Sequence, residues 1–523
     1  GGHAVKAGGF ALVGTPLQEK KGYRDSPEIA ARDLLAWGED ADPDWVRRYV
    51  TASRADVHDW LSSLGVRWGF ILDTPEHSVP RFHFATGAAL NVVVPMMRAA
   101  FADADVAFHW NTEVVSLINS NGTVRGVRVR ELRTGLEHDL VAPAVIIATG
   151  GWQNDLAFVR REWRDDLPAP SHLYSGAGYF ATGTGIRLAQ AVGAATTRMD
   201  HQVTFTTGIP DPRDPGGTRA LLSQNPAAIW VNSEGRRFIN EAGPSKVADK
   251  TVLGLTPATH WLIFDADGFR SLRIRDAVWL GNPQGIEPLK QAGLIRQADS
   301  IPALAIAAGL PVAALESTVQ RWKAAVLAGE DTDFARFSPG TPDPAARVLR
   351  KAPYYALQLF PMTRKSMGGL AIDANTRVLD QQGRPIPGLY AAGEVTGVAG
   401  INGSYGGEGT FLGPSVYLGR LAGRAVAGSN PVSRSPELFP APAKIQVSAD
   451  PAYRAGAITV PADALPQLID AKRPGYWHFE VAHRVVLERA LDCTACHTPS
   501  WPTVAPATAA QRQEQLNACS TCH

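Results

Sequence analysis

Cysteine is nearly absent from this chain of 523 residues, which contains four, all at or beyond position 493. They form two Cys-x-x-Cys pairs, Cys493 with Cys496 and Cys519 with Cys522. A disulfide framework within the preceding residues is excluded, because no cysteine occurs there. The pairs themselves need another explanation.

Long apolar runs and an excess of charge of one sign are lacking as well. The most apolar segment, LVAPAVIIATGG at 140–151, is too short to span a bilayer and ends in Gly-Gly, as a buried strand would. The 51 basic and 50 acidic side chains leave a net charge of +1. The sequence therefore predicts no transmembrane segment, and nothing in its charge favours a nucleic-acid partner or an anionic membrane.

A histidine follows each cysteine pair, His497 after the first and His523 after the second. In a c-type haem site both thiols bind the porphyrin and the histidine binds the iron. Alternatively, the four thiolates could share one tetrahedral zinc, or either pair could be a redox dithiol. Zinc does not explain the two histidines, and a thioredoxin-like dithiol would need a βαβ setting. The pattern favours two covalently bound c-type haems.

The surroundings of these pairs predict a small cytochrome module at 475–523. Its apolar residues fall at helical spacing before the first pair, which predicts a mainly α-helical module. Because no methionine follows Met367, His478 and His483 are the candidate sixth ligands of the irons. The stretch 429–474 is rich in Pro, Ala and Ser and predicts a linker. Covalent haem attachment takes place outside the bacterial cytoplasm, so we expect a periplasmic protein.

The preceding part of the chain has the pattern of an α/β protein. Two alternating stretches flank the Asn-Gly at 121–122, which is a hairpin signal, and a short apolar strand then enters Gly150. A second strand, GLYAAGE, begins at 388 after a Gln-Gly turn, and Pro414 stands near an expected helix start. Each signal alone is weak, because many α/β folds have strands that end in glycine.

Their order is more specific. The segments GGHAVKAGG, GTPLQ, IIATGGWQND, ATGTGIRLAQAVGA, WVNSEGRRFINE, SMGGLAID, IPGLYAAGEVTG and GTFLGPSVYLGRLAG occur in turn over residues 1–428. In this combination the chain resembles the flavoproteins that include soluble fumarate reductases, succinate dehydrogenase flavoprotein subunits and 3-ketosteroid dehydrogenases. The resemblance implies an α/β fold with a doubly wound FAD-binding domain (1–199 and 366–428), interrupted by an α+β capping domain (200–365). The active site would lie between the two.

The resemblance also implies the FAD contacts. They are Gly8, Gly9, Ala148, Thr149, Gly150, Gly393, Glu394, Gly409, Leu412 and Ser415. The family's first strand and its GxGxxG loop are not in the sequence, and we expect them to precede residue 1. Some family members are flavocytochromes c, in which c-type haems exchange electrons with FAD; their haems precede the flavin domain, whereas here they follow it.

The substrate-binding positions depart from the fumarate reductase pattern. Where that pattern has cationic side chains, this sequence has Phe205, Ser245 and Ser404, and a lysine, Lys365, at the fourth position. These differences count against fumarate or succinate as the substrate. Arg364, Lys365 and Lys246 are left as candidates for binding another anion.

The loop GSYGGEGTFLGP at 403–414 is similar instead to the ketosteroid dehydrogenases. There a tyrosine hydroxyl and a glycine amide bind the substrate carbonyl, at positions that correspond to Tyr405 and Gly409. The family's second tyrosine, the proposed base, is Ser245 here, and serine cannot serve as that base unaided. Candidate substitutes are His201, Tyr174, Tyr179 and Lys365.

Together these features predict a periplasmic flavocytochrome c oxidoreductase. We expect it to dehydrogenate a CH–CH (or CH–OH) unit next to a carbonyl, with electrons passing through two haems to a redox partner such as a cytochrome or a quinone-linked dehydrogenase. One alternative is a reductase of an unsaturated acid or enone that is fed by the haems. Another is an electron-transfer subunit with a degenerate flavin site.

Overall fold

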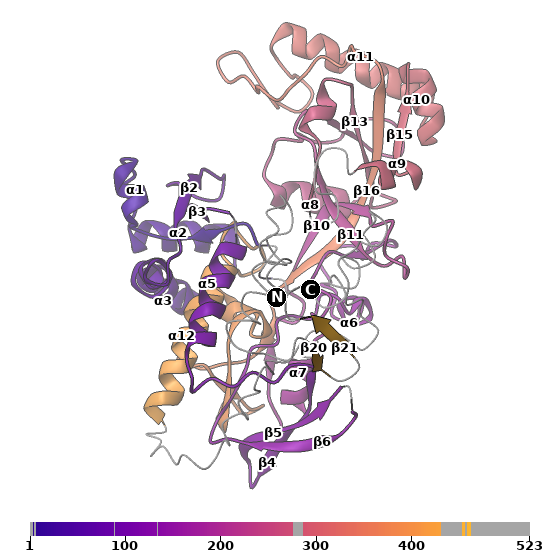
Figure 1. The fold of residues 1–523 in the computed structure, drawn as a ribbon. Helices are drawn as coiled ribbons and strands as arrows, with labels where there is room; N and C mark the ends of the chain where they lie inside the picture. The colour runs from indigo at the N-terminus through magenta and orange to yellow at the C-terminus, as the bar shows by residue number, and fades with distance from the viewer. Residues whose placement is uncertain are drawn as a thin grey trace.

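The computed structural model of the protein describes residues 4, 7–87, 89–132, 134–275, 286–429, 452–455 and 458–461. In Figure 1 the long strand β16 (Tyr354–Ser366) runs from an upper part, which contains α10 and α11, toward the centre of the molecule. The lower part contains α7, α12 and the β4–β6 sheet. The arrangement is mixed α/β, as the sequence predicts.

The upper part is built on an eight-stranded sheet. Six strands follow the order β12-β13-β16-β10-β11-β14, and β15 and β8 also pair with β16. Their bounds are β8 (Tyr174–Ser175), β10 (Gln202–Pro210), β11 (Ala220–Gln224), β12 (Ile229–Val231), β13 (His260–Phe264), β14 (Arg273–Arg275) and β15 (Ile295–Ala298).

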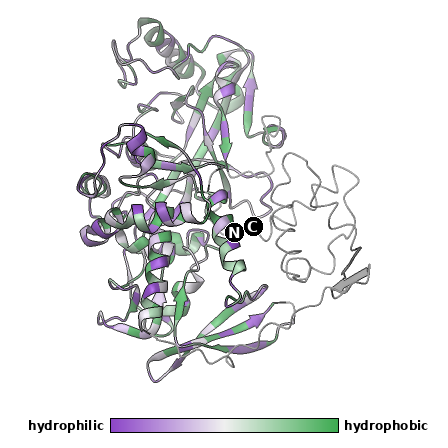
Figure 2. Cartoon of the chain, turned by 60° about the vertical axis from the view of Figure 1, so that its left-hand side comes forward, coloured by the Kyte–Doolittle hydropathy of each residue, from purple (hydrophilic) through white to green (hydrophobic). Residues whose placement is uncertain are grey.

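The core of this part is formed where the sheet meets two helices, α10 (Ile301–Ala308) and α11 (Val312–Ala328). Every residue of β13 is buried, and hydrophobic residues run along the strands of the sheet (Figure 2). A strand that is buried on both faces needs this continuous apolar pattern rather than an alternating one.

The lower part contains the sheet that the Gly-rich segments predict. In it β7 (Val145–Ile147) pairs in parallel with β19 (Pro385–Ala391), which pairs with β18 (Arg377–Leu379). Parallel pairing places the carboxyl ends of both strands at one edge of the sheet, although they lie far apart in the sequence. The edge where parallel strands end is where α/β sheets bind ligands. Helix α12 (Leu412–Ser429) includes Pro414 in its first turn, as expected.

The Asn-Gly hairpin is confirmed. Strands β4 (Thr112–Ser120) and β5 (Thr123–Glu131) are antiparallel, and Ser120 pairs with Thr123 across a two-residue turn. Asn121 and Gly122 both have positive φ, of 51° and 78°. Asparagine and glycine tolerate that conformation, which is why this dipeptide predicts such a turn.

The N-terminal residues form short helices against a three-stranded sheet of order β1-β3-β2. The elements are β1 (Phe10–Ala11), α1 (Pro16–Lys20), α2 (Pro27–Gly38), α3 (Pro43–Ala52), η2 (Ser53–Asp59), α4 (Trp60–Ser63), β2 (Trp68–Leu72), β3 (Phe82–Ala85) and α5 (Leu90–Ala102). Thr15, Ser26 and Asp42 each accept a backbone hydrogen bond from the first turn of α1, α2 and α3, respectively, and so fix where these helices begin.

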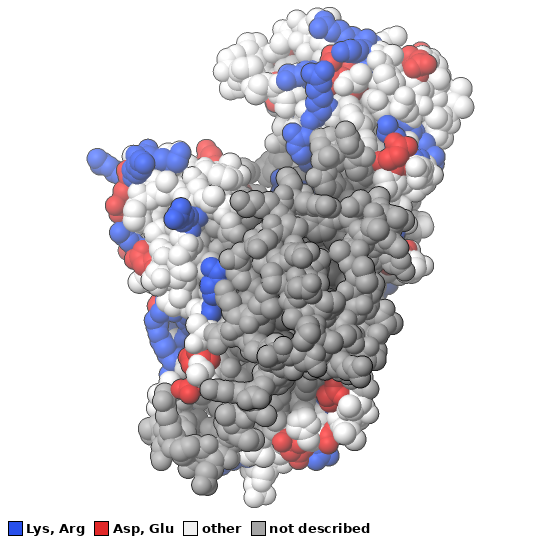
Figure 3. Space-filling view, in the orientation of Figure 1, with Lys and Arg blue, Asp and Glu red and all other residues white. Residues whose placement is uncertain are grey.

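The remaining elements complete the described structure. They are β6 (Glu137–Val141), α6 (Leu156–Arg161), α7 (Thr184–Gln190), β9 (Thr196–Thr197), α8 (Ser245–Leu253), η3 (Gly268–Ser271), α9 (Glu287–Gln291), β17 (Gly369–Leu370), η6 (Gly393–Val395) and η7 (Gly397–Gly400). Acidic and basic side chains both occur on the described surface visible in Figure 3. No helix within the described ranges is long and apolar enough to cross a membrane.

The predicted linker holds an antiparallel pair of strands, β20 (Ala452–Ala455) and β21 (Ile458–Pro461), which its composition did not predict. The residues predicted to attach the haems and to bind their irons lie outside the described residues. They are Cys493, Cys496, His497, Cys519, Cys522 and His523, with His478 and His483. The domain boundaries at 199, 365, 428 and 474 stay predictions.

Arg81 links the N-terminal elements through buried charges. Its guanidinium is fully buried and donates to Asp25 at 2.8 Å and to Asp33 at 2.6 Å. These bonds raise the pKa of Arg81 against the opposing effect of its burial. Removing one member of such a cluster leaves uncompensated charge in the interior.

We therefore expect Arg81→Met to lower the free energy of unfolding by about 3–5 kcal/mol. The matched control is Arg128→Met, which breaks an exposed ion pair with Asp139 and should change stability little. Urea unfolding of both variants, followed by circular dichroism, measures the difference. Equal changes in the two variants would contradict this account of Arg81.

Candidate active site

A cleft lies between helix α8, strand β10 and two loops, at 163–167 and 404–406. The space between these elements, with open solvent included, is about 590 Å³. The lining side chains are Trp37, Trp163, Arg164, Leu167, Gln202, Val203, Thr204, Phe205, Ser245, Lys246, Asp249, Lys250, Leu253, Met367, Ser404 and Tyr405, with Gly406.

Several residues that the sequence singled out meet in this cleft. Phe205, Ser245 and Ser404, three of the positions that are cationic in fumarate reductases, all line it together with Tyr405. Lys365 pairs in register with the cleft residue Val203 across β16 and β10. Its ammonium lies 4.1 Å from the centre of the Phe411 ring, and Lys365 itself is not part of the lining.

Cations surround Tyr405, which is half-buried. The ammonium groups of Lys246 and Lys250 lie 4.2 and 4.5 Å from its ring centre, and the Arg164 guanidinium carbon lies at 5.4 Å. Hydrogen bonding with Tyr405 raises the pKa of Lys250. Positive charge at this distance stabilises negative charge that develops near the phenol. Tyr405 is therefore well placed to donate to a polarised oxygen.

The other proposed bases do not line the cleft. His201 is held between Asp40 and Asp200, at 2.8 Å from each. Burial acts to raise the pKa of Asp40, but hydrogen bonds from His201 and Ser404 lower it to about 2. Tyr174 packs against Phe360, and Tyr179 is 44% exposed with the Arg219 guanidinium over its ring.

Sequence reasoning missed Asp249. It lies one helical turn beyond Ser245 on α8 and lines the same cleft. Thr206 donates a hydrogen bond from its hydroxyl to the Asp249 carboxylate at 2.9 Å. Enclosure by protein raises the pKa of Asp249 to about 7, against the lowering effect of Thr206. The i, i+4 spacing from Ser245 was the signal that could have revealed it.

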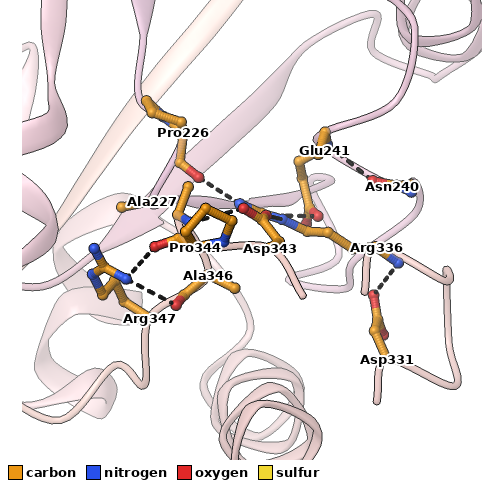
Figure 4. Close-up of polar contacts among 12 residues, drawn as sticks. Pro226, Ala227, Asn240, Glu241, Asp331, Arg336, Asp343, Pro344, Ala346 and Arg347 are labelled. Atoms are coloured by element: carbon orange, nitrogen blue, oxygen red, sulfur yellow. Dashed lines mark hydrogen bonds and ion pairs between the residues drawn. The ribbon is translucent and has the colours of Figure 1, made fainter. Parts of the chain in front are cut away.

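A buried charge network fixes the segment that leads into α8. Arg237 donates to Glu241 at 2.8 Å and to Asp331 at 2.9 Å. Arg336 donates to Asp343 at 2.7 Å and lies 3.3 Å from Glu241 (Figure 4). Because these groups are almost fully buried and mutually paired, they hold the backbone just before α8 in one position.

Two of the predicted FAD segments, 8–9 and 409–415, adjoin at β1. The amide of Ala11 donates to the carbonyl of Gly409 at 3.0 Å. Gly409 has a φ of 80°, and a Cβ there would lie 2.3 Å from the Ala11 nitrogen. Only glycine meets both demands. Gly8 and Gly9 precede β1 directly and pack against Phe82 and Phe84.

The other predicted FAD residues follow the two parallel strands. Ala148, Thr149 and Gly150 come directly after β7, and Gly393 and Glu394 after β19. Glu394 accepts a hydrogen bond from the Ser366 amide at 2.8 Å, and burial raises its pKa.

The first turn of α12 meets the second of these loops. The Ser415 hydroxyl donates to the Phe411 carbonyl at 2.7 Å. A Cβ on Gly393 would lie 3.6 Å from the hydroxyl oxygen of Ser415. Leu412 is the first residue of α12. The structure thus gathers the predicted residues at two loci, one at β1 and one at the strand ends.

Two glutamines near these loci have unpartnered polar atoms. Gln153 is fully buried, Gln202 is 7% exposed, and within the described residues no hydrogen-bond partner exists for either amide. Burying an amide without a partner is unfavourable, so such groups indicate a ligand that has both donors and acceptors. A flavin ring has both. Gly150 and Gly393 add left-handed backbone without close neighbours, and the residues present fit FAD.

Comparisons with known proteins identify the family of this chain. The protein-family description "FAD binding domain" matches residues 1–412. A fumarate reductase (cytochrome) of Shewanella frigidimarina is 30% identical over 435 residues, which covers 82% of this chain and 71% of that protein. A KsdD-like steroid dehydrogenase of Mycobacterium tuberculosis is 28% identical and covers 80% of this chain and 88% of its own length.

Other relatives widen the range of named activities. A urocanate reductase of Eggerthella lenta is 27% identical, covering 76% of this chain and 64% of that protein. Among solved structures, the open conformation of a flavocytochrome c3 fumarate reductase aligns with a TM-score of 0.65 at 28% identity, over 82% of this chain and 72% of that one. A 3-ketosteroid Δ1-dehydrogenase from Sterolibacterium denitrificans has the same TM-score at 21% identity and so shows the fold alone.

Gly409 gives a test of the flavin side of the site. We expect Gly409→Ala to retain at least tenfold less FAD, because a Cβ there separates the loop from β1. FAD released by denaturation and measured by fluorescence reports the content. Gly419→Ala is the control: it lies on α12 with open space at its Cβ and should keep full FAD content. Full FAD content in Gly409→Ala would contradict the assignment.

Asp249 gives a test in stability. Its pKa is about 7 in the folded protein and near 3.8 when exposed, so folding favours the protonated form. Stability conferred by that protonated form is lost as the pH rises from about 4 to about 7, by as much as about 4 kcal/mol. Asp249→Asn should flatten this loss in unfolding experiments at pH 5 and pH 8. Asp267→Asn removes an exposed carboxylate paired with Lys351 and should leave the loss of stability between pH 5 and pH 8 unchanged.

Proposed function

Because this chain belongs to the FAD-binding family, and is an FAD-dependent oxidoreductase of the fumarate reductase, steroid dehydrogenase and urocanate reductase type, we propose that it dehydrogenates a carbonyl compound. The bond oxidised is a CH–CH (or CH–OH) unit next to the carbonyl. FAD, when bound, supplies hydride transfer with the substrate.

The observation that carries this proposal is Tyr405 in the cleft, with three cations around its ring. A phenol that donates to the substrate carbonyl stabilises the negative charge that develops on its oxygen when the neighbouring carbon loses a proton. Phe205, Ser245 and Ser404 line the same cleft, and none of them can form an ion pair with a carboxylate. The positions that are cationic in the fumarate reductase pattern therefore give no support to a dicarboxylate such as fumarate, whereas Tyr405 suits a ketone.

The C-terminal motifs extend the proposal to electron transfer. The two Cys-x-x-Cys-His units support covalent c-type haems, and the similarity to a fumarate reductase (cytochrome) supports a flavocytochrome. A flavin exchanges two electrons with a substrate and one at a time with a haem, so haems would connect the site to a redox partner protein. Haem attachment supports a periplasmic location. The boundaries at 199, 365, 428 and 474 belong to the same proposal.

A second candidate is the reverse reaction, reduction of an enone or unsaturated acid. It is favoured by similarity to reductases and by Lys246 and Lys250, which could bind a carboxylate. The two directions differ in haem colour. Haem reduction on adding saturated cyclic ketones supports dehydrogenation, and re-oxidation of pre-reduced haem by enones or unsaturated acids supports reduction.

The composition of the purified full chain comes first. We expect one FAD per chain by fluorescence after denaturation, and two covalent haems by the pyridine haemochrome assay. A protein without FAD would contradict both directions and support an electron-transfer subunit. A protein with zinc and no covalent haem would overturn the cytochrome tail.

Tyr405→Phe removes only the phenolic hydroxyl. We expect kcat/KM to fall about 10²- to 10³-fold, because loss of one such donor removes transition-state stabilisation, while FAD content stays the same. Tyr354→Phe, the same substitution at a buried tyrosine outside the cleft, should keep wild-type activity. Equal activity in the two variants would overturn the role of Tyr405.

A further inference from the structure

Helix α8 presents two residues of different chemical capacity to the cleft. Ser245 stands in the first turn and is exposed, and Asp249 follows one turn later. Serine has no basic form near neutral pH, so Ser245 cannot take a proton from carbon by itself. A carboxylate can, when a neighbouring carbonyl acidifies the C–H bond. The same helix thus offers a base at a different position.

The surroundings of Asp249 keep its carboxyl poised. Helix α8 packs on β10, and Thr206 on that strand donates a hydrogen bond to Asp249. Asp249 is half-buried and lines the cleft, and the enclosing protein raises the pKa of its carboxyl to about 7. At neutral pH both protonation states are therefore populated, which suits a group that must take up and release a proton.

The charged groups around the cleft have partners other than Asp249. They are Lys246 and Lys250 on α8 itself, Glu39 at the end of α2, and Arg164 and Tyr405 on the two loops. Lys246 pairs with Glu39, Arg164 pairs with Asp166, and Lys250 interacts with Tyr405. In the described part of the chain no ion pair reaches Asp249. A carboxyl without a counter-charge can change its protonation without breaking a salt bridge.

The unpartnered amide of Gln202, which fits the flavin ring, connects this end of the cleft to the flavin side of the site. Gln202, at the start of β10, lines the cleft, and its amide is buried without a partner among the described residues. Four positions along the same strand stands Thr206, the partner of Asp249. The unpartnered amide of Gln202 and Thr206, which donates to the Asp249 carboxyl, therefore lie on the same strand.

We propose that Asp249 is the proton-transfer group of this cleft, in place of the base that the family resemblance puts at Ser245. This inference rests on the proposed function and names its acid–base residue. In dehydrogenation the Asp249 carboxylate takes the proton from the carbon next to the carbonyl. The electron pair of that C–H bond forms the new C=C bond, and the adjacent carbon loses a hydride to FAD, the oxidant. In reduction the protonated carboxyl returns the proton to the same carbon.

The direction of reaction sets the sign of the pH dependence. Dehydrogenation needs the carboxylate, so its rate should rise with pH through about 7 and then level off. Reduction needs the carboxylic acid, so its rate should fall over the same range. Because the Thr206 hydrogen bond lowers the pKa of Asp249, Thr206→Val should move either pH limb to higher pH.

The decisive experiment compares Asp249→Asn with Asp211→Asn in the FAD-loaded full chain. Asp211 is also a carboxyl whose pKa is raised by burial, but it lies outside the cleft. We expect Asp249→Asn to lower kcat about 10²- to 10⁴-fold and to abolish the pH limb near 7. Asp211→Asn should keep the wild-type kcat and the pH limb near 7. Asp249→Glu, which retains a carboxyl, should restore part of the rate with a shifted limb.

A measurement on the protein alone separates this inference from the proposed function. Infrared difference spectra between pH 5 and pH 9 should contain a carboxyl band that titrates near 7 in the wild type and disappears in Asp249→Asn. Absence of that band overturns the inference. So does a retained pH limb in an active, folded Asp249→Asn. Failure of the proposed function has another signature, namely missing FAD or no electron exchange with ketones, enones or unsaturated acids.

Discussion

The pairing of β10 with β16 is the contact on which the candidate site depends. β16 belongs to the large sheet and ends at Ser366, whose amide donates to Glu394 in the predicted flavin loop. β10 begins at Gln202, on the wall of the cleft, and carries Thr206, which holds Asp249. The pairing of these two strands therefore fixes where the cleft with Asp249 lies relative to the predicted flavin loop with Glu394. Displacing it would separate the groups that must act together.

Charge is used in two ways in this protein. Arg81, Arg237 and Arg336 are buried with carboxylate partners and hold backbone segments in place, because a buried ion that lost its partner would be costly. In the cleft, charged groups are not matched one to one with buried counter-charges. Cations surround Tyr405, and Asp249 has a hydroxyl partner instead of a counter-charge. The rigid networks fix geometry, and the loosely paired groups can change charge during a reaction.

Local patterns predicted much of the flavin half. The Asn121–Gly122 turn, the strands that end before Gly150 and Gly393, and the helix that begins near Pro414 all follow from short-range backbone preferences. The cleft was harder to predict. Phe205, Ser245, Ser404 and Tyr405 were each singled out by resemblance, but Asp249 was not, because nothing in its neighbours in the sequence shows that Thr206 lies beside it.

The sequence by itself indicated FAD, through the order of its Gly-rich segments, and the family match supports this cofactor. Its two Cys-x-x-Cys-His units predict haem from spacing within a short segment, and that prediction lies outside the described residues. Tertiary structure decided which side chains share the cleft, and what their protonation is. The pKa of Asp249 depends on how much protein encloses it, and His201 is held by Asp40 from another element. Burial and partners across the chain are properties of the packed fold, because they arise only when distant segments meet.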